Sequence, residues 1–271
     1  MYALYGRNRA GLSSVLRLAS GLDEPDYGDI RLFGKNIQTQ KKHLLPSIGV
    51  LLDPPAVYTN LTVEDNLRVL EMIRPKQKRN MADDMMEQLG ISRYKSKKAN
   101  TLDADQKKRL GLAIALLHDP EILILDEPFR GFDFNGMKEV SRLLKNLCDE
   151  YGKTILLSSH TLSEVENVAD CIGYMEQGNL IEEIFTKDKE EINRQYIYLV
   201  VDHVSNIIPI IERDLDIHNF HVVNDNSLKI FDLSKDSGEI NTCLNRNGVI
   251  VKEIYMHKGS LQEYLNEIGR R

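Results

Sequence analysis

Short apolar runs alternate with amphipathic stretches along roughly the first two thirds of the chain. Runs typical of buried strands occur at 1–5, 30–33, 48–52, 122–125 and 154–158. Between them, apolar residues recur at helical spacing over 13–22, 62–73, 81–89, 104–117 and 137–151. Strands that alternate with helices in this way predict an α/β domain with a mainly parallel sheet.

Local signals mark the ends of two of these helices. Thr62-Val63-Glu64-Asp65 has the pattern of a capping box, which predicts a helix start at this point. Asp103 is a suitable N-cap for the helix over 104–117, and His118-Asp119-Pro120 ends it.

The pattern changes after Thr186. Strand patterns at 196–201, 221–223, 228–231 and 249–254 alternate with helical patterns at 206–214 and 239–247. We therefore expect an α/β domain over residues 1–186 and a small α+β accessory domain over 187–271, with a ferredoxin-like arrangement as one option for its topology.

Composition and charge exclude several classes of protein. The chain has 35 basic and 41 acidic residues among 271, so no overall positive charge favours nucleic acid, and we expect none as a partner. Three scattered cysteines favour neither a disulfide framework nor a zinc ribbon, which suits a reducing, cytoplasmic compartment. No apolar run reaches the roughly 18 residues that a membrane-spanning helix needs.

A glycine-rich segment follows the first strand. Gly6 and Gly11 match the phosphate-binding pattern GxxxxGK[ST], with Ser13 and Ser14 following, but Leu12 stands where that pattern has lysine. Backbone N–H groups at a helix start bind phosphate whatever the side chains, whereas the lysine adds a positive charge. Arg9, or less favourably Arg7, is a candidate substitute, although Arg9 takes a position that favours glycine. A plain strand-to-helix turn explains the segment equally well.

Two acids end the apolar run Ile122 to Leu125. Asp126 is placed to hold Mg²⁺, and Glu127 to orient an attacking water. His160 follows the next apolar strand and should emerge at the same carboxyl edge of the sheet, where open α/β sheets bind ligands. Taken one at a time, each of these residues is also compatible with a solvated strand end.

The order of these motifs resembles that of the nucleotide-binding subunit of an ABC transporter, over essentially the whole chain. Leu102-Asp103-Ala104-Asp105-Gln106 stands where the family has its LSGGQ signature. Ile122 to Glu127 is similar to the Walker B strand, Gly131-Phe132-Asp133 to the D-loop, and His160 to the switch histidine.

One branch of that family is the most similar. The strand 48–52 resembles the Q-loop strand, and Asp53 takes the place of its glutamine. The segments Asp53-Pro54-Pro55-Ala56-Val57-Tyr58 and Asn60-Leu61-Thr62, like the C-terminal tail, look most like the bacitracin-resistance and lantibiotic-immunity branch.

The resemblance implies a fold, ligands and partners. It implies a P-loop ABC ATPase fold for 1–186, with a helical subdomain over about 54–118. It implies ATP and Mg²⁺ as ligands, a membrane-spanning permease as partner, and a homodimer or a heterodimer with another nucleotide-binding subunit. The subunit would be peripheral at the inner face of the cell membrane. The implied site residues, by role, are: catalytic, Glu127 and His160; nucleotide-binding, Gly6, Asn8, Arg9, Gly11, Ser13, Ser14 and Asp133; metal-binding, Ser13, Asp53 and Asp126.

Three departures from the family pattern lead us to expect impaired activity. Leu12 removes a phosphate ligand, and Asp103 and Asp105 replace a hydroxyl and a glycine in the signature. The family usually has further strands before the P-loop, with an aromatic residue that stacks on adenine, so we expect an N-terminally truncated cassette or a misassigned start.

Two functions remain open from the sequence. In the first, the chain couples ATP binding and hydrolysis to export or removal of a peptide antibiotic through a separate membrane subunit. In the second, it is a non-hydrolysing regulatory or structural pseudo-subunit of such a complex.

Overall fold

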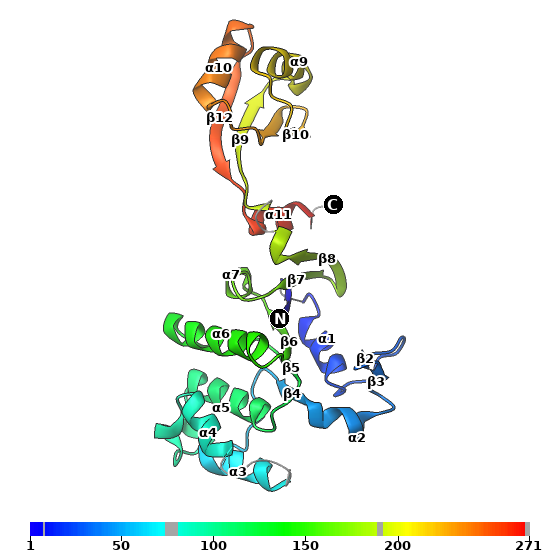
Figure 1. The fold of residues 1–271 in the computed structure, drawn as a ribbon, viewed down its shortest axis with the longest axis vertical. Coiled ribbons are helices and arrows are strands. Elements are labelled where there is room, and N and C mark those ends of the chain that lie inside the picture. The colour runs from blue at the N-terminus through cyan, green and yellow to red at the C-terminus, as the bar shows by residue number, and fades with distance from the viewer. Residues whose placement is uncertain (8, 74–80, 189–191, 269–271) are drawn as a thin grey trace. The chain divides into compact units, whose positions relative to one another are not determined.

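The computed structural model describes residues 1–7, 9–73, 81–188 and 192–268 (Figure 1). The chain divides into two compact units, Met1–Phe185 and Thr186–Arg271. Among the described residues, the helices are too short or too polar to cross a bilayer.

A six-stranded sheet in the order β4-β5-β6-β1-β7-β8 forms the centre of the first unit. The first five strands in that order are parallel, and β8 runs antiparallel to β7. The strands are β1 (Tyr2–Gly6), β4 (Ile48–Leu51), β5 (Ile122–Leu125), β6 (Thr154–Ser159), β7 (Cys171–Glu176) and β8 (Asn179–Phe185). This confirms the mainly parallel sheet that the apolar runs predict.

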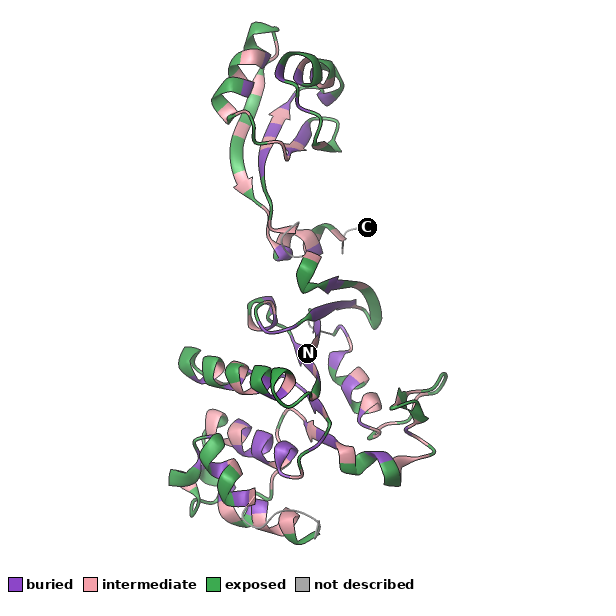
Figure 2. Ribbon diagram, in the orientation of Figure 1, coloured by how far each residue is buried: buried purple, intermediate pink, exposed green. Residues whose placement is uncertain are grey.

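Helices lie on both faces of this sheet, with α1 on one side and α5 and α6 on the other (Figure 1). The helices and 3-10 turns of the unit are α1 (Leu12–Ala19), α2 (Lys41–Leu44), η1 (Leu45–Ser47), α3 (Val63–Ile73), α4 (Met81–Gln88), η2 (Ser92–Tyr94), η3 (Ala99–Thr101), α5 (Ala104–Leu116), α6 (Phe134–Asp149) and α7 (Leu162–Val165). The central strands are almost wholly buried (Figure 2), which explains their continuous apolar sequence.

Two helices end or begin at other residues than predicted, and in both cases the capping interactions explain the difference. Helix α1 ends at Ala19, three residues before the predicted end, because Gly21 adopts a φ of 71° and its N–H bonds to Leu18 O, which closes the helix. Helix α6 begins at Phe134, three residues before the predicted start, because the Asp133 side chain accepts the N–H of Gly136 at 2.7 Å as an N-cap.

Two parts of the sheet pattern differ from the sequence prediction. The strand expected over 30–33 is only the two-residue β2 (Arg31–Leu32), which pairs with β3 (Lys35–Asn36) in a small hairpin outside the main sheet. The turn residues Phe33 and Gly34 have φ of 52° and 74°, so the chain reverses there instead of extending the strand. Strands β7 and β8 have no counterpart among the predicted runs.

The second unit has the element order βαββαβ. Its elements are η4 (Thr186–Asp188), β9 (Gln195–Val201), α9 (Val204–Leu215), β10 (Phe220–Asn224), β11 (Ser227–Ile230), α10 (Ser237–Arg246), β12 (Val251–Lys258) and α11 (Leu261–Ile268). Its antiparallel sheet runs β10-β11-β9-β12 and packs its core against α9 and α10. This is the split βαβ topology of ferredoxin-like folds, the option that the sequence pattern raised.

Candidate functional site

The glycine-rich loop joins β1 to α1 on the first unit. A Cβ on Gly6 would lie 2.6 Å from both Met175 O and Ala10 Cβ, so a larger residue would clash with the backbone of β7. Gly11 precedes α1 with a φ of 91° and provides no side-chain cap. The first N–H groups of α1, which as in any helix have no intrahelical partners, are therefore not capped by a side chain of Gly11, and groups of this kind bind phosphate.

Leu12 occupies the position of the P-loop lysine, and its side chain packs into the apolar core beneath the loop. It is only 2% exposed and belongs to the cluster that includes Leu16, Ile37 and Ile124. The structure therefore supplies no positive charge from this position.

Arg9 lies exposed in the same loop, with a φ of 71°. This is the left-handed region, which favours glycine as predicted for this position, so the arginine backbone is strained there. Asn8, its neighbour and another predicted nucleotide-binding residue, lies outside the described residues.

Ser13 joins the loop to the end of β5. Its hydroxyl donates to Asp126 Oδ1 at 3.2 Å, which brings two of the three predicted metal ligands together. Ser14 follows it, exposed in the first turn of α1.

Ser158, which is not among the predicted site residues, bridges the two acids at the end of β5. This fully buried residue on β6 donates through its hydroxyl to Asp126 Oδ1 at 2.6 Å and accepts the N–H of Glu127 at 3.0 Å. It thereby holds Glu127 in an unusual backbone conformation, with a φ of 48°. The signal that could have found it is register, since Leu157 lies opposite Leu125 in the parallel pair.

Glu127 and His160 face one another beside the loop. Glu127 is 8% exposed, and burial raises the pKa of its carboxyl above the ordinary value, while the nearby His160 ring counteracts part of that rise. His160 Nδ1 donates to Gly6 O at 2.7 Å, and its Nε2 lies 3.7 Å from Glu127 Oε1. Glu127 Oε1 is buried and has no hydrogen-bond partner within the described part of the chain. This oxygen is therefore free of partners among the described residues, and it could accept a hydrogen bond from a water molecule that enters the site.

Asp53, the third predicted metal ligand, bonds to two cationic side chains. Its Oδ1 accepts from Lys108 Nζ at 2.8 Å, and its Oδ2 accepts from Arg130 Nη1 at 3.0 Å. Neither cation was predicted as a site residue. Asp133, predicted to bind nucleotide, is the N-cap of α6.

The two acids of the signature-like segment also have local partners. The Asp103 side chain accepts the N–H of Gln106 at 2.8 Å and forms a capping box with it, which confirms the predicted N-cap. The Asp105 carboxylate accepts from Arg109 Nε at 3.0 and 3.2 Å. The negative charge of Asp105 is therefore partly balanced within its own helix.

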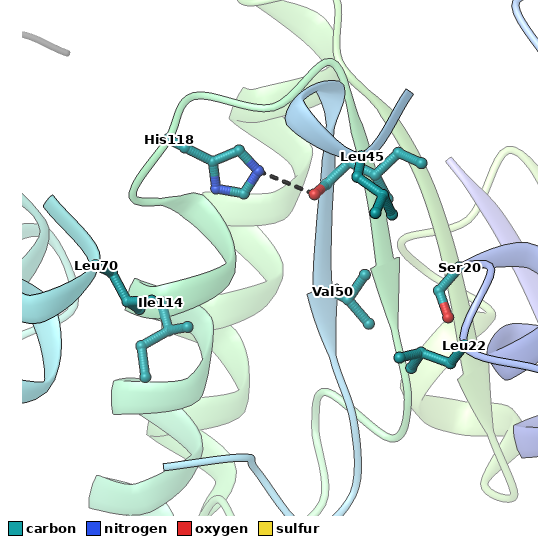
Figure 3. A pocket seen from close by; sticks show the side chains of 8 residues that line it. Ser20, Leu22, Leu45, Val50, Leu70, Ile114 and His118 are labelled. Atoms are coloured by element: carbon teal, nitrogen blue, oxygen red, sulfur yellow. Dashed lines mark hydrogen bonds between the residues drawn. The ribbon is translucent and has the colours of Figure 1, made fainter. Parts of the chain in front are cut away.

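An apolar pocket of 260 Å³ lies beside β4, the strand that leads to Asp53 (Figure 3). The imidazole of His118 donates to Ile48 O at 2.9 Å at one side of it, and Leu22 and Leu45 are partly exposed at the other. Its lining residues are Ser20, Leu22, Leu45, Ile48, Val50, Leu70, Ile114 and His118.

The oxygen atoms and N–H groups at this site are suited in part to Mg²⁺ and a chain of phosphates. Mg²⁺ usually takes one or two protein oxygens and completes its shell with water and phosphate, and Ser13 and Asp126 offer such a pair. Within the described ranges, three or more His, Cys, Asp or Glu residues never group into a ready-made metal site. The backbone cradle is present, whereas the lysine charge for the outer phosphates is absent.

Comparisons with known proteins agree with this geometry. A family model described as ABC transporter matches residues 1–130. The bacitracin transport ATP-binding protein BcrA of Bacillus licheniformis is 36% identical over 97% of this chain and 86% of its own length. The lantibiotic transport ATP-binding protein SrtF of Streptococcus pyogenes is 33% identical over 67% of this chain and 77% of its own.

Solved structures show the same fold. The ATP-binding cassette MJ0796, solved as a dimer with ADP and Pi, aligns with a TM-score of 0.65 at 21% identity, over 69% of this chain and 85% of that one. CbiO1 from Clostridium perfringens, part of an ABC transporter complex, aligns with a TM-score of 0.59 at 28% identity, over 69% of this chain and 77% of that one. This chain belongs to the ATP-binding proteins of the ABC transporter family.

Proposed function

We propose that this chain is the ATP-binding subunit of an ABC transporter that exports or removes a peptide antibiotic of the bacitracin or lantibiotic class. The observation that carries the proposal is the alignment with BcrA, which extends through both units of this chain. The lantibiotic transport relative supports the same class of cargo.

The residues at the carboxyl edge of the sheet have distinct roles in this proposal. The N–H groups at the start of α1 hold the phosphates, and Ser13 and Asp126 hold Mg²⁺. Bound Mg²⁺ would neutralise charge on the phosphates. Glu127 accepts the proton of the attacking water, and His160, held by Gly6 O, fixes the position of that carboxylate.

The proposed activity is impaired, because one side of the site lacks its cation. Leu12 is buried in the core, so it contributes nothing to the outer phosphates. Among the described residues of the loop, Arg9 is the exposed cation nearest in sequence to Gly11. In the proposal it contributes part of the missing positive charge.

We further propose that a cytoplasmic segment of the permease docks at the apolar pocket beside β4. Leu22 and Leu45, which line it, are 52% and 40% exposed, and an apolar surface of this kind favours a partner. Ile48 and Val50 of strand β4 line this pocket, and the same strand leads on to Asp53, so in this proposal β4 connects a partner held there to the site. In this proposal the subunit works at the inner face of the membrane.

The signature-like segment supports a dimer with a second nucleotide-binding subunit. Asp103 and Asp105 stand where the family uses a hydroxyl and a glycine toward the partner's nucleotide, which favours a heterodimer over a homodimer. In a heterodimer this chain would contribute its Walker B acids to one of the two sites.

ATP hydrolysis by the purified chain, alone and with its membrane partner, tests the proposal. We expect a low rate alone, a higher rate with the permease, and a loss of about 10²–10⁴-fold in Glu127→Gln, the scale of general-base catalysis. Glu87→Gln, an exposed acid on α4, is the matched control. A rate that is equal in both variants would contradict the assigned role of Glu127.

Leu12 also supports a second candidate function, a non-hydrolysing pseudo-subunit that dimerises or docks without turnover. This candidate predicts no heat of MgATP binding by calorimetry and no thermal shift on adding MgATP. Micromolar binding would exclude it in this strict form.

A further inference from the structure

Three charged side chains from separate parts of the first unit meet at Asp53. Asp53 follows β4, Lys108 lies on α5, and Arg130 lies in the loop after β5. The Asp53 carboxylate bonds to Lys108 Nζ at 2.8 Å through Oδ1 and to Arg130 Nη1 at 3.0 Å through Oδ2. We refer to Asp53, Lys108 and Arg130 as the Asp53 triad.

The two cations differ in their exposure to solvent. The Lys108 side chain is 3% exposed, whereas that of Arg130 is 70% exposed. An ammonium taken out of water is strongly destabilising unless an anion compensates it. Lys108 therefore fixes one oxygen of Asp53 in place, while Arg130 holds the other through a weaker, solvent-screened contact.

Close packing brings Lys108 to this position. A Cβ on Gly111, one turn further along α5, would lie 2.6 Å from Leu51 Cδ1 and 2.8 Å from Pro55 Cβ. The helix thus touches the end of β4 and the residues after Asp53 directly. The ion pair forms at a contact that the fold already makes.

The triad also reaches the candidate general base. The N–H of Arg130 bonds to Glu127 O at 3.2 Å, and the N–H of Phe132 bonds to Phe129 O at 3.3 Å. Residues 127–132 therefore form a compact turn that carries Glu127 at one end and the Arg130 side chain within it. A restraint on Arg130 restrains the segment that places Glu127.

We propose that Asp53 is the hub of an ion-pair triad that holds segment 127–132 against α5, with Lys108 as a positioning residue, and that Asp53 is not a magnesium ligand. The hydrogen bonds support this assignment, because both carboxylate oxygens of Asp53 already accept from cationic side chains. Ser13 and Asp126, the other two predicted metal ligands, have no cationic partner in this group and lie together, with their oxygens 3.2 Å apart. The assignment deepens the proposed function and rests on it only for the consequence to Glu127.

Amide hydrogen exchange of segment 127–132, measured without nucleotide, is the first test. We expect Arg130→Gln to speed exchange there about two- to fivefold, the scale of an exposed ion pair, because it removes the bond that joins the segment to Asp53. Lys108→Met should speed exchange about twofold, because Asp53 loses one of its two partners but keeps its bond to Arg130. Lys107→Met changes the adjacent lysine on the same helix, which lies outside the triad, and should leave exchange unchanged. Equal exchange in Lys108→Met and Lys107→Met would overturn the proposal.

Asp53→Asn by itself leaves Lys108 buried without its anion and can unfold the chain. The double variant Asp53→Asn with Lys108→Met removes both charges of this pair, so that no buried ammonium is left without an anion. It should restore the midpoint of urea unfolding to near that of the unchanged protein, while exchange of 127–132 stays fast because Arg130 has lost its partner. Exchange as slow as in the unchanged protein would contradict the positioning role.

Magnesium dependence of ATP binding separates the two roles of Asp53. If Asp53 is not a ligand, the double variant keeps the same gain in ATP affinity on adding Mg²⁺ as the unchanged protein. A loss of that gain would assign Asp53 to the metal and overturn the second half of the proposal. If no ATP binds to any variant, the proposed function is wrong, but the exchange measurements still decide the triad.

Discussion

The two sides of the candidate nucleotide site are built in different ways. At the ends of β5 and β6, Asp126, Glu127 and Ser158 form a buried network in which side chains and backbone bond to one another. At the start of α1, the loop offers backbone N–H groups and an exposed Arg9, while Leu12 has joined the apolar core. One side is part of the folded interior, whereas the charge of the other comes, in the proposal, from the exposed Arg9.

The comparison shows which parts of such a site the fold itself maintains. Each member of a buried polar network must keep its partners, because an unsatisfied group costs folding free energy. A cation in an open loop contributes little to folding, so its replacement by a buried leucine leaves the fold intact. The side at the ends of β5 and β6 therefore contributes to folding as well as to the site, whereas a cation on the phosphate side is not needed for folding.

Returning the lysine to the P-loop should produce the largest change in MgATP affinity on the loop side of the site. In Leu12→Lys we expect MgATP affinity to rise about 10- to 100-fold, since a hydrogen bond to a charged group contributes about 1.5–3 kcal/mol. Without nucleotide, the free energy of unfolding should fall by about 2 kcal/mol, because a buried apolar side chain is lost. Calorimetric titration and urea unfolding measure the two effects.

Leu12→Met is the control for this change, because it keeps the apolar character and adds no charge. If Leu12→Met raised MgATP affinity as much as Leu12→Lys, or if neither variant changed it, the loop side of the site would not be limited by the missing lysine charge.

Removal of the Ser158 hydroxyl should weaken the network side. Ser158→Ala leaves the Glu127 N–H and Asp126 Oδ1 with one partner fewer, so we expect the free energy of unfolding to fall by about 1–3 kcal/mol. Ser159→Ala removes bonds to Thr161 and Glu164 instead and provides the comparison. Urea unfolding of both variants measures the difference. If Ser158→Ala proves no less stable than the unchanged protein, the network does not contribute to folding as described.

Arg9 allows strain and charge to be separated on the loop side. Arg9→Gly relieves the left-handed backbone, so it should be about 1 kcal/mol more stable than Arg9→Ala, which keeps that conformation. Both variants remove the guanidinium, and an equal loss of MgATP affinity in both would assign the charge a role at the phosphates. Unchanged affinity in both would show that Arg9 does not substitute for the lysine.

The smallest expected effect is the pH dependence that Glu127 contributes to stability. Burial raises its pKa in the folded protein above the unfolded value, so stability is lost as the pH rises between the two values and stays lower above them. Glu127→Gln should therefore melt at a higher temperature than the unchanged protein at neutral pH. The difference should vanish below the ordinary glutamate pKa of about 4.3. A melting difference that is independent of pH would contradict the buried-carboxylate interpretation; Glu87→Gln should show no difference at either pH.

Local patterns predicted the elements that depend on neighbouring residues. The apolar run of β5, the start of α3 and the Asp103 cap of α5 all involve residues within a few positions of one another. The pairing of Asp105 with Arg109, four residues apart on a helix, was open to the same reasoning. Strand β8 was missed because it mixes exposed apolar and acidic residues and has no clean period. Strand β7 is a short, buried and mostly apolar run, so its sequence carried a signal that the prediction overlooked.

The sequence by itself determined the order of the motifs, and with it the family and the loss of the P-loop lysine. Only the tertiary structure decided where several of those residues act. It buried Leu12, placed Ser158 between Asp126 and Glu127, and joined Asp53 to Lys108 and Arg130, which lie 55 and 77 positions away. The physical reason is that periodicity and capping report on neighbours along the chain. The partners of a buried polar group are set by the register of strands and the packing of helices from distant segments.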